Sequence, residues 1–169
     1  SKYTFDRVFG LDSTQEEVYD SIGHVALTSL RQGFNSTVLA YGQTGSGKTF
    51  SMEGAKDASG RYTSLGLIPR IFESVFAMFQ NDTDVKSFEV SMQFIELYNE
   101  QLQDLLGKRE KVEVTSDPMG GYRAKDAVTH ICKDPADAQV HYNRGCDMRA
   151  TAATGMNEQS SRSHALLQE

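Results

Sequence analysis

A glycine-rich octapeptide is the part of this chain whose residue types and spacing most directly indicate chemistry. It fits the pattern G-x-x-x-x-G-K-[ST], in which glycines let successive backbone N–H groups point into one concavity that suits phosphate oxygens. Lys48 can reach the β- and γ-phosphates of a nucleotide, and the Thr49 hydroxyl can hold Mg²⁺. The predicted phosphate-binding loop (P-loop) consists of Gly42, Gln43, Thr44, Gly45, Ser46, Gly47, Lys48 and Thr49.

A second polar cluster, residues 157–164, carries groups that could act on a bound nucleotide. Ser160, Ser161 and Ser163 supply three hydroxyls, and Arg162 supplies a cation. Hydroxyls can hold Mg²⁺ or its waters, and an arginine can form an ion pair that switches with nucleotide state. The composition of the cluster alone nevertheless favours a solvated serine-rich loop.

The elements around the octapeptide must hold it in position. Residues 36–41 are apolar and β-branched, which predicts a short buried strand, and residues 49–53 can open a helix. The order strand, loop, helix is the one that the phosphate-binding mechanism requires. Residues 3–9 indicate a short strand or extended segment, and the polar residues 54–65 indicate a surface loop.

Two helices are predicted in the first half of the chain. The first begins at a capping box formed by Ser13 and Glu16 and is ended by Gly33. Its apolar positions are Val18, Ile22, Val25, Ala26 and Leu30. The second carries Pro69 in its first turn. Its apolar face, interpreted as core, consists of Ile71, Phe72, Val75, Phe76 and Phe79.

The second half continues the alternation of strands and helices. Apolar residues at every second position, Phe88 to Phe94, predict a strand. Residues 99–106 indicate a short helix that ends at Gly107, and the polar residues 108–125 leave room for a hairpin around residues 118–121.

A last helix is predicted from residue 134 onward. Asp134 suits the N-cap, Pro135 suits the first helical position, Asp137 lies in the first turn, and Gly145 is expected to end the helix. Strands that alternate with helices in this way predict an α/β layered fold.

Composition narrows the class of protein. The chain has 169 residues, a net charge of −6 and a sequence pI of about 5.2, which argues against a general nucleic-acid binder. No run approaches the roughly 18 apolar residues of a membrane span, so we expect no membrane insertion. Cys132 and Cys146 have neither metal-site nor redox spacing, and the four histidines form no metal-ligand pattern in the sequence.

Two motifs together make the chain similar to the N-terminal part of a kinesin motor domain. Residues 157–164 match the family's N-x-x-S-S-R-S-H switch I motif at every fixed position, and residues 40–54 (AYGQTGSGKTFSMEG) match its P-loop segment almost letter for letter. The resemblance covers nearly the whole chain. Further matches are residues 5–9, 66–70, 96–100 and 104–106.

The resemblance implies a role for each matching position. Residues 42–49 would cradle the phosphates of ATP or ADP, and Phe50 would lie near the adenine. Thr49 and Ser161 would hold Mg²⁺ directly or through water. Ser160 and Ser161 would sense the γ-phosphate and position the attacking water, and Arg162 would pair with a glutamate from a later motif. Residues 108–125 would belong to the microtubule-touching region, and its basic residues are Lys108, Arg109, Lys111, Arg123 and Lys125.

Parts of the family pattern are not found between residues 1 and 169. The family's first strand and everything after switch I, including the D-x-x-G of switch II, have no match. Residues 117–120 fit D-x-x-G but precede switch I and follow a run too polar for a buried strand. We therefore expect a partial α/β P-loop NTPase domain, with a mixed central sheet flanked by helices. Its P-loop strand would expose apolar edges in isolation.

The resemblance implies an ATP-dependent motor with a microtubule-stimulated ATPase, acting in the cytoplasm on the microtubule cytoskeleton. The isolated 169 residues are expected to be inactive. One alternative is a module that binds nucleotide and microtubules without productive turnover. An unrelated GTPase is disfavoured, because the N-K-x-D guanine motif is absent. Tubulin is the expected partner, and a dimer through a coiled coil outside these residues is compatible with the resemblance.

Overall fold

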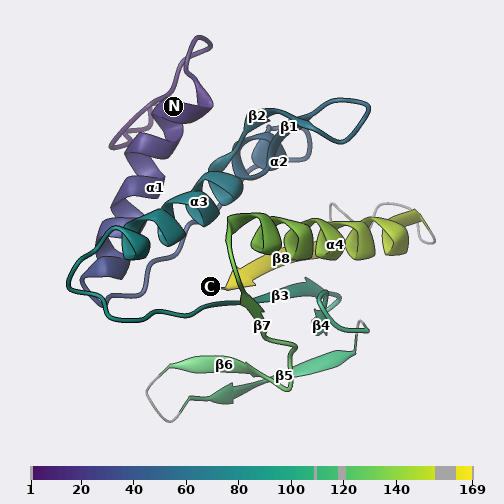
Figure 1. Ribbon diagram of the computed structural model, residues 1–169. Helices are drawn as coiled ribbons and strands as arrows, with labels where there is room; N and C mark the ends of the chain where they lie inside the picture. The colour runs from purple at the N-terminus through teal and green to yellow at the C-terminus, as the bar shows by residue number, and fades with distance from the viewer. Residues whose placement is uncertain (1, 109, 118–120, 155–162, 169) are drawn as a thin grey trace. The chain divides into compact units, whose positions relative to one another are not determined.

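The computed structural model describes residues 2–108, 110–117, 121–154 and 163–168, and Figure 1 traces their elements. The chain divides into two compact units, residues 1–81 and 82–169, and each is described by itself. None of the helices among the described residues combines the length and the apolar character that a membrane-spanning segment needs.

Helix α1 of the first unit spans Gln15–Arg31 and begins one position later than predicted. The Thr14 hydroxyl accepts a hydrogen bond from the Glu17 backbone N–H, and the Glu17 carboxylate accepts one from the Thr14 backbone N–H. The capping box is therefore formed by Thr14 and Glu17, and the predicted pair of Ser13 and Glu16 is wrong. Both pairs have the required spacing, but the Ser13 N–H is used by a turn that closes on Gly10 O.

The buried stripe of α1 is narrower than its apolar spacing predicted. Leu27 is buried, whereas Val25, one of the apolar positions at helical spacing, is 62% exposed. Helix α1 packs against helix α3 (Leu67–Gln80), and the Tyr19 hydroxyl donates a hydrogen bond to Ser74 Oγ. Helix α3 covers this stripe, and the apolar residues on other sides of α1 face outward. The other apolar positions at helical spacing that are exposed are Ile22 and Leu30.

Helix α3 confirms its prediction closely. Pro69 lies in the first turn, where its missing N–H has no intrahelical partner to lose. The predicted apolar residues Phe72, Val75 and Phe76 are buried, together with Leu67 and Ile68 at the start of the helix. This helix supplies most of the core of the first unit.

A short hairpin follows the predicted P-loop. Strands β1 (Gly54–Lys56) and β2 (Tyr62–Leu65) pair antiparallel, so the prediction of a surface loop over residues 54–65 is wrong at both ends. Asp57 organises the turn, because its carboxylate accepts hydrogen bonds from Ser59 and Arg61. The Ser59 hydroxyl is the main cause that lowers the pKa of this carboxyl group.

The strand predicted before the P-loop is not formed. Residues 36–41 have no regular structure, and Leu39 and Tyr41 are 82% and 95% exposed. Residues 3–9 likewise form no strand. The sequence supplies only the β-propensity of these segments, whereas a strand also needs a paired neighbour, and no described strand pairs with either segment.

The second unit is built on a six-stranded sheet, in which β6, β5, β4, β3 and β7 follow one another and β8 also pairs with β3 (Figure 1). Each of these pairs is antiparallel. The central strand β3 confirms the predicted alternation, with Val90, Met92 and Phe94 buried. The strands are β3 (Val90–Tyr98), β4 (Gln101–Asp104), β5 (Lys111–Ser116), β6 (Tyr122–Lys125), β7 (His130–Cys132) and β8 (Ser163–Gln168).

The connections within this sheet correct one prediction and confirm another. Residues 99–106 do not form a helix. Asn99 and Glu100 have positive φ angles of 49° and 60° and make the two-residue turn that joins β3 to β4. The predicted hairpin over residues 108–125 is confirmed as β5 and β6, although residues 118–120 lie outside the described residues.

Helix α4 spans Pro135–Thr154 and contacts β3. Asp134 is the predicted N-cap, because its carboxylate accepts the Asp137 backbone N–H. Gly145 does not end the helix, contrary to prediction. A Cβ built on Gly145 would lie 2.3 Å from the Phe94 ring, so this glycine allows close contact between α4 and β3. The absence of a side chain serves packing here rather than helix termination.

Candidate functional site

The predicted P-loop lies at the surface of the first unit. Residues 42–47 are exposed and have no helical or strand structure. Gly45 and Gly47 have φ angles of 80° and 89°, in the left-handed region that other residues rarely adopt. The Ser46 N–H donates to Gln43 O at 3.2 Å, which closes a turn inside the loop. The loop therefore has the curled backbone that its glycine spacing predicted.

Lys48 lies at the junction between this loop and helix α2 (Lys48–Met52). Its Nζ donates to Gly42 O at 2.8 Å and to Gln43 O at 2.7 Å. These contacts keep the ammonium group against the loop and use two of its three N–H donors. The result is a positive charge beside an exposed, glycine-rich backbone, which is the donor set that a phosphate group requires.

Helix α2 is a single short helix of five residues, with Gly47 as its N-cap. Thr49 and Phe50 on this helix are exposed, so the Thr49 hydroxyl is accessible to a metal ion. The Phe50 carbonyl accepts a hydrogen bond from the Gln15 side chain, which ties α2 to the first turn of α1. The residues predicted to hold Mg²⁺ and adenine on this side therefore remain accessible to a ligand.

The other predicted residues, Ser160, Ser161 and Arg162, lie outside the described residues, as does most of the 157–164 motif. The structure describes the two elements on either side of it. Helix α4 ends at Thr154, and β8 begins at Ser163, which is buried and paired with Tyr98 of β3.

An arginine that the sequence analysis did not single out links these two elements. Arg149 Nε donates to Glu96 Oε1 at 3.1 Å, and Arg149 Nη2 donates to Ser163 Oγ at 2.8 Å and to Ser163 O at 3.2 Å. Glu96 is 0% exposed, in the middle of β3. A buried carboxylate in a strand whose neighbouring residues, Ile95 and Leu97, are apolar requires a partner. This was the signal in the sequence that could have led to Arg149.

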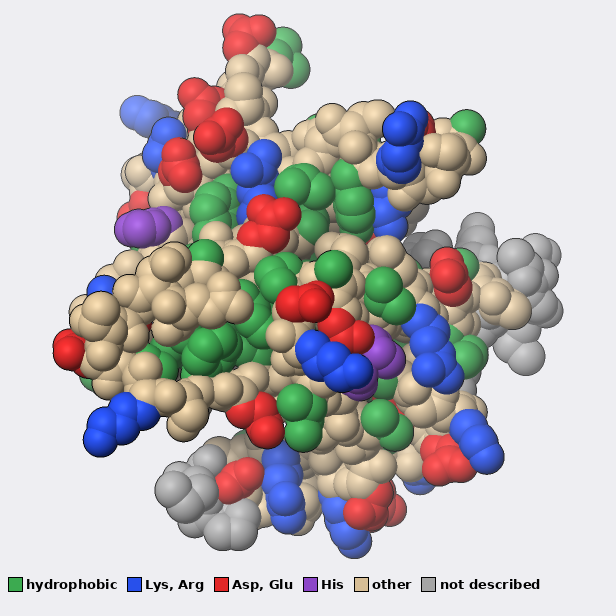
Figure 2. Space-filling model, in the orientation of Figure 1, with side chains coloured by type: hydrophobic (Ala, Val, Ile, Leu, Met, Phe, Trp, Pro, Cys, Tyr) green, Lys and Arg blue, Asp and Glu red, His purple; other side chains and the backbone are tan. Residues whose placement is uncertain are grey.

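Basic residues lie on one face of the β5–β6 hairpin. Lys111 and Glu113 are two residues apart on β5, so their side chains share a face, and Glu113 lies opposite Lys125 in the antiparallel register. Thr115 lies opposite Arg123 on that same face. Lys111, Arg123 and Lys125 are exposed. Figure 2 shows Lys and Arg side chains around the lower end of the view, where Figure 1 draws these strands.

A family model described as "Kinesin motor domain" matches residues 1–168. A kinesin-like protein KIF15 from Rattus norvegicus is 39% identical over 176 residues, which cover 97% of this chain and 12% of that protein. The kinesin-like protein KIN-14Q from Oryza sativa subsp. japonica is 40% identical over 167 residues, which cover 98% of this chain and 17% of that protein.

The chromosome-associated kinesin KIF4 from Mus musculus gives a similar result. It is 37% identical over 169 residues, which cover 97% of this chain and 14% of that protein. The chain thus spans between 12% and 17% of the length of these three relatives.

Proposed function

The chain belongs to the kinesin motor domain family, and from this premise we propose that the whole protein hydrolyses Mg-ATP to move along microtubules. The observation that carries the proposal is the geometry at residues 42–48. Left-handed backbone at Gly45 and Gly47 curls the loop, and the Lys48 ammonium lies against it. The exposed loop thus offers backbone N–H groups and a cation to an incoming phosphate chain.

The same positions suggest how the ligand would be held. Residues 42–48 would bind the phosphates of ATP or ADP, and the exposed ring of Phe50 would lie near the adenine. The Thr49 hydroxyl, with Ser161, would hold Mg²⁺, which neutralises phosphate charge during hydrolysis. Ser160 and Ser161 would position the attacking water, and Arg162 would form an ion pair that responds to the γ-phosphate.

The contacts of Arg149 support the idea that residues 157–164 form a switch. A switch passes a change at the nucleotide to the rest of the fold through discrete contacts. The motif follows α4, which ends at Thr154, and its last two residues, Ser163 and His164, lie in β8. Arg149 holds Ser163 through two hydrogen bonds and is itself held by the buried Glu96.

The basic face of the β5–β6 hairpin supports a microtubule contact. With a net charge of −6, the chain would meet an acidic partner through a local basic patch, and Lys111, Arg123 and Lys125 provide one. The nearby Glu113 offsets part of that charge. We assign this face to the part of the protein that contacts the microtubule.

We also propose that residues 36–41 form their strand only in the longer protein. Leu39 and Tyr41 are almost fully exposed, and exposed apolar segments with unpaired backbone promote aggregation. The chain also spans under a fifth of the length of its three relatives. A cooperative, monomeric melt of the 169 residues alone would contradict this proposal.

Nucleotide binding is the first step to test, by titrating the longer protein with a fluorescent ATP analogue in the presence of Mg²⁺. Lys48→Ala removes the cation at the loop, and we expect affinity to fall about 10- to 100-fold, as for loss of a charge-assisted hydrogen bond. Lys56→Ala, an exposed lysine of the β1–β2 hairpin, is the matched control and should bind normally. Equal affinity in the two variants would refute the assignment of the loop.

A further inference from the structure

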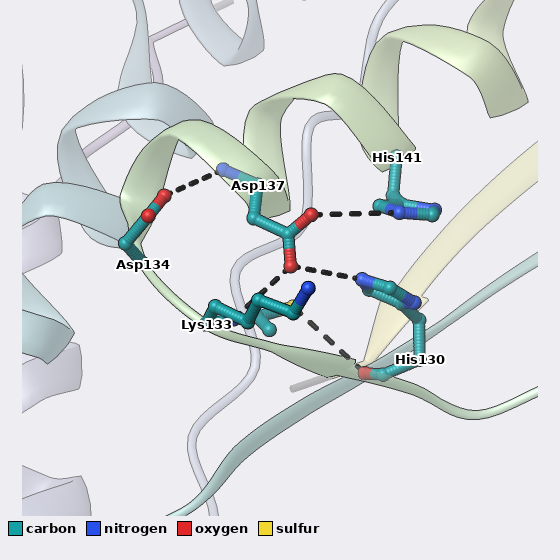
Figure 3. Close-up of polar contacts among 6 residues, drawn as sticks. His130, Lys133, Asp134, Asp137 and His141 are labelled. Carbon is teal, nitrogen blue, oxygen red and sulfur yellow. Dashed lines mark hydrogen bonds and ion pairs between the residues drawn. The ribbon is translucent and has the colours of Figure 1, made fainter.

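Two histidines and an aspartate come together at the start of α4, and none of the three is among the residues proposed above for the nucleotide or microtubule sites. His130 lies on β7, whereas Asp137 and His141 lie on the first turns of α4 (Figure 3). His130 Nε2 is 3.1 Å from Asp137 Oδ2, and His141 Nε2 is 3.6 Å from Asp137 Oδ1. One ligand atom from each of the three residues lies within 4.8 Å of the other two. The sequence did not indicate this cluster, because His130 belongs to a different element from Asp137 and His141.

Secondary structure holds all three side chains in place. Asp137 and His141 are four residues apart on a helix and therefore share a face. The Asp137 carboxylate also accepts the Lys133 backbone N–H at 3.1 Å, which fixes its orientation. His130 is paired with Met92 of the central strand β3. The cluster is thus largely formed before any ligand arrives.

We propose that His130, Asp137 and His141 bind one divalent transition-metal ion, with Zn²⁺ the best fit. Imidazole nitrogen and carboxylate oxygen are the ligand types that suit Zn²⁺. Ligands in a tetrahedral zinc site are about 3.4 Å apart, given bond lengths near 2.1 Å. Each imidazole is near that distance from one oxygen of Asp137: His130 Nε2 is 3.1 Å from Oδ2, and His141 Nε2 is 3.6 Å from Oδ1. A small movement of the side chains would place a single carboxylate oxygen and both nitrogens around one ion.

The surroundings leave room for the ion and for water. The three side chains are between 23% and 25% exposed, so an ion can enter and a water molecule can complete the coordination. The two imidazole rings are stacked, with centroids 3.3 Å apart and planes 25° apart. The Nε2 atoms of both rings lie on the side of Asp137, where an ion would bind.

The charges around the cluster act in opposite directions. The Asp137 carboxylate lies beside both imidazoles and supplies a negative charge that attracts a dication. The positive charges of Lys133 and Arg144 also act on His141 and would weaken binding of a dication. These cations favour a moderate affinity over a tight one.

A bound ion would connect β7 to α4 and so stabilise the second unit. An ion that binds only the folded state adds to the free energy of unfolding in proportion to the logarithm of its concentration. The inference uses no residue of the proposed nucleotide site and does not depend on that function.

The test is a titration of the purified, metal-free protein with Zn²⁺ and with Co²⁺, in the absence of nucleotide and Mg²⁺. We expect one ion per chain and, for Co²⁺, a visible absorption spectrum typical of nitrogen and oxygen ligands. His141→Gln and Asp137→Asn should each weaken binding by more than about 10-fold, since even residues outside the coordination sphere affect metal affinity on that scale. Zn²⁺ should raise the Tm of the unsubstituted protein but not that of His141→Gln.

His24→Gln is the matched control, because His24 is an exposed histidine of α1 outside the cluster. It should bind Zn²⁺ with the stoichiometry and affinity of the unsubstituted protein. Asp137→Asn also disturbs the start of α4, so His141→Gln is the decisive variant. Far-UV circular dichroism should verify that this variant is folded. Absence of binding, or equal affinity in His141→Gln and His24→Gln, would overturn the proposal.

Discussion

Arg149 of α4 donates a hydrogen bond to the fully buried carboxylate of Glu96 in β3, with Nε and Oε1 3.1 Å apart. The same guanidinium reaches the backbone and side chain of Ser163 at the start of β8. One planar cation thereby joins a helix, the central strand and the strand β8. The fixed fork of an arginine suits this geometry better than a lysine.

Arg149→Met should therefore destabilise the protein markedly. Breaking a buried ion pair by removing one partner costs about 3 to 5 kcal/mol. Because Arg149 is itself partly exposed, we expect a smaller loss of about 2 to 4 kcal/mol, measured by urea denaturation. Adding Glu96→Gln to this variant should recover part of the loss, since the two residues interact.

Arg144→Met is the control for this prediction. Arg144 is an exposed arginine on the same helix, and its loss should change the free energy of unfolding by less than about 0.5 kcal/mol. If Arg149→Met is no less stable than Arg144→Met, the ion pair with Glu96 does not support the fold.

Gly145→Ala should destabilise the protein, although alanine is the better helix former. A Cβ at this position would overlap the Phe94 ring, which is 2% exposed and stacked on Tyr142. Overpacking costs about 1 to 3 kcal/mol, and the gain in helix propensity offsets about 1 kcal/mol of it. Thermal denaturation should show a lower Tm for Gly145→Ala. Gly10→Ala, where a Cβ meets nothing within 4 Å, should show no such drop.

The basic face of the β5–β6 hairpin should govern microtubule affinity in the longer protein. Reversing Lys111 and Lys125 to glutamate should weaken co-sedimentation with microtubules on the order of 10-fold at low salt. The effect should shrink as salt is added, because exposed charges are screened. Lys86→Glu reverses an exposed charge outside the hairpin, and an equal loss of binding there would show that net charge, rather than this face, is responsible.

The sequence predicted best where a single helix carries a wide apolar face. Helix α3 buries Phe72, Val75 and Phe76 as expected, because several apolar residues at helical spacing can only be covered together. The α/β class was also predictable, and the positive φ angles of Gly45 and Gly47 are ones that glycine adopts readily.

Other features depend on partners distant in the sequence, and there the predictions were wrong. Residues 36–41 have the composition of a strand but no paired neighbour among the described residues. The turn at Asn99 and Glu100 lacks the glycine that usually marks a two-residue hairpin, so the sequence predicts a helix there instead. The sequence predicts a helix end at Gly145, because it does not show that the Phe94 ring packs against this residue.

Phosphate release by the longer protein, measured with and without microtubules and repeated with Arg162→Ala, tests the proposed motor function most directly. We expect microtubules to stimulate ATP turnover, and we expect Arg162→Ala to bind nucleotide normally but to turn it over slowly. Nucleotide binding without any microtubule stimulation, or normal turnover in Arg162→Ala, would contradict this proposal.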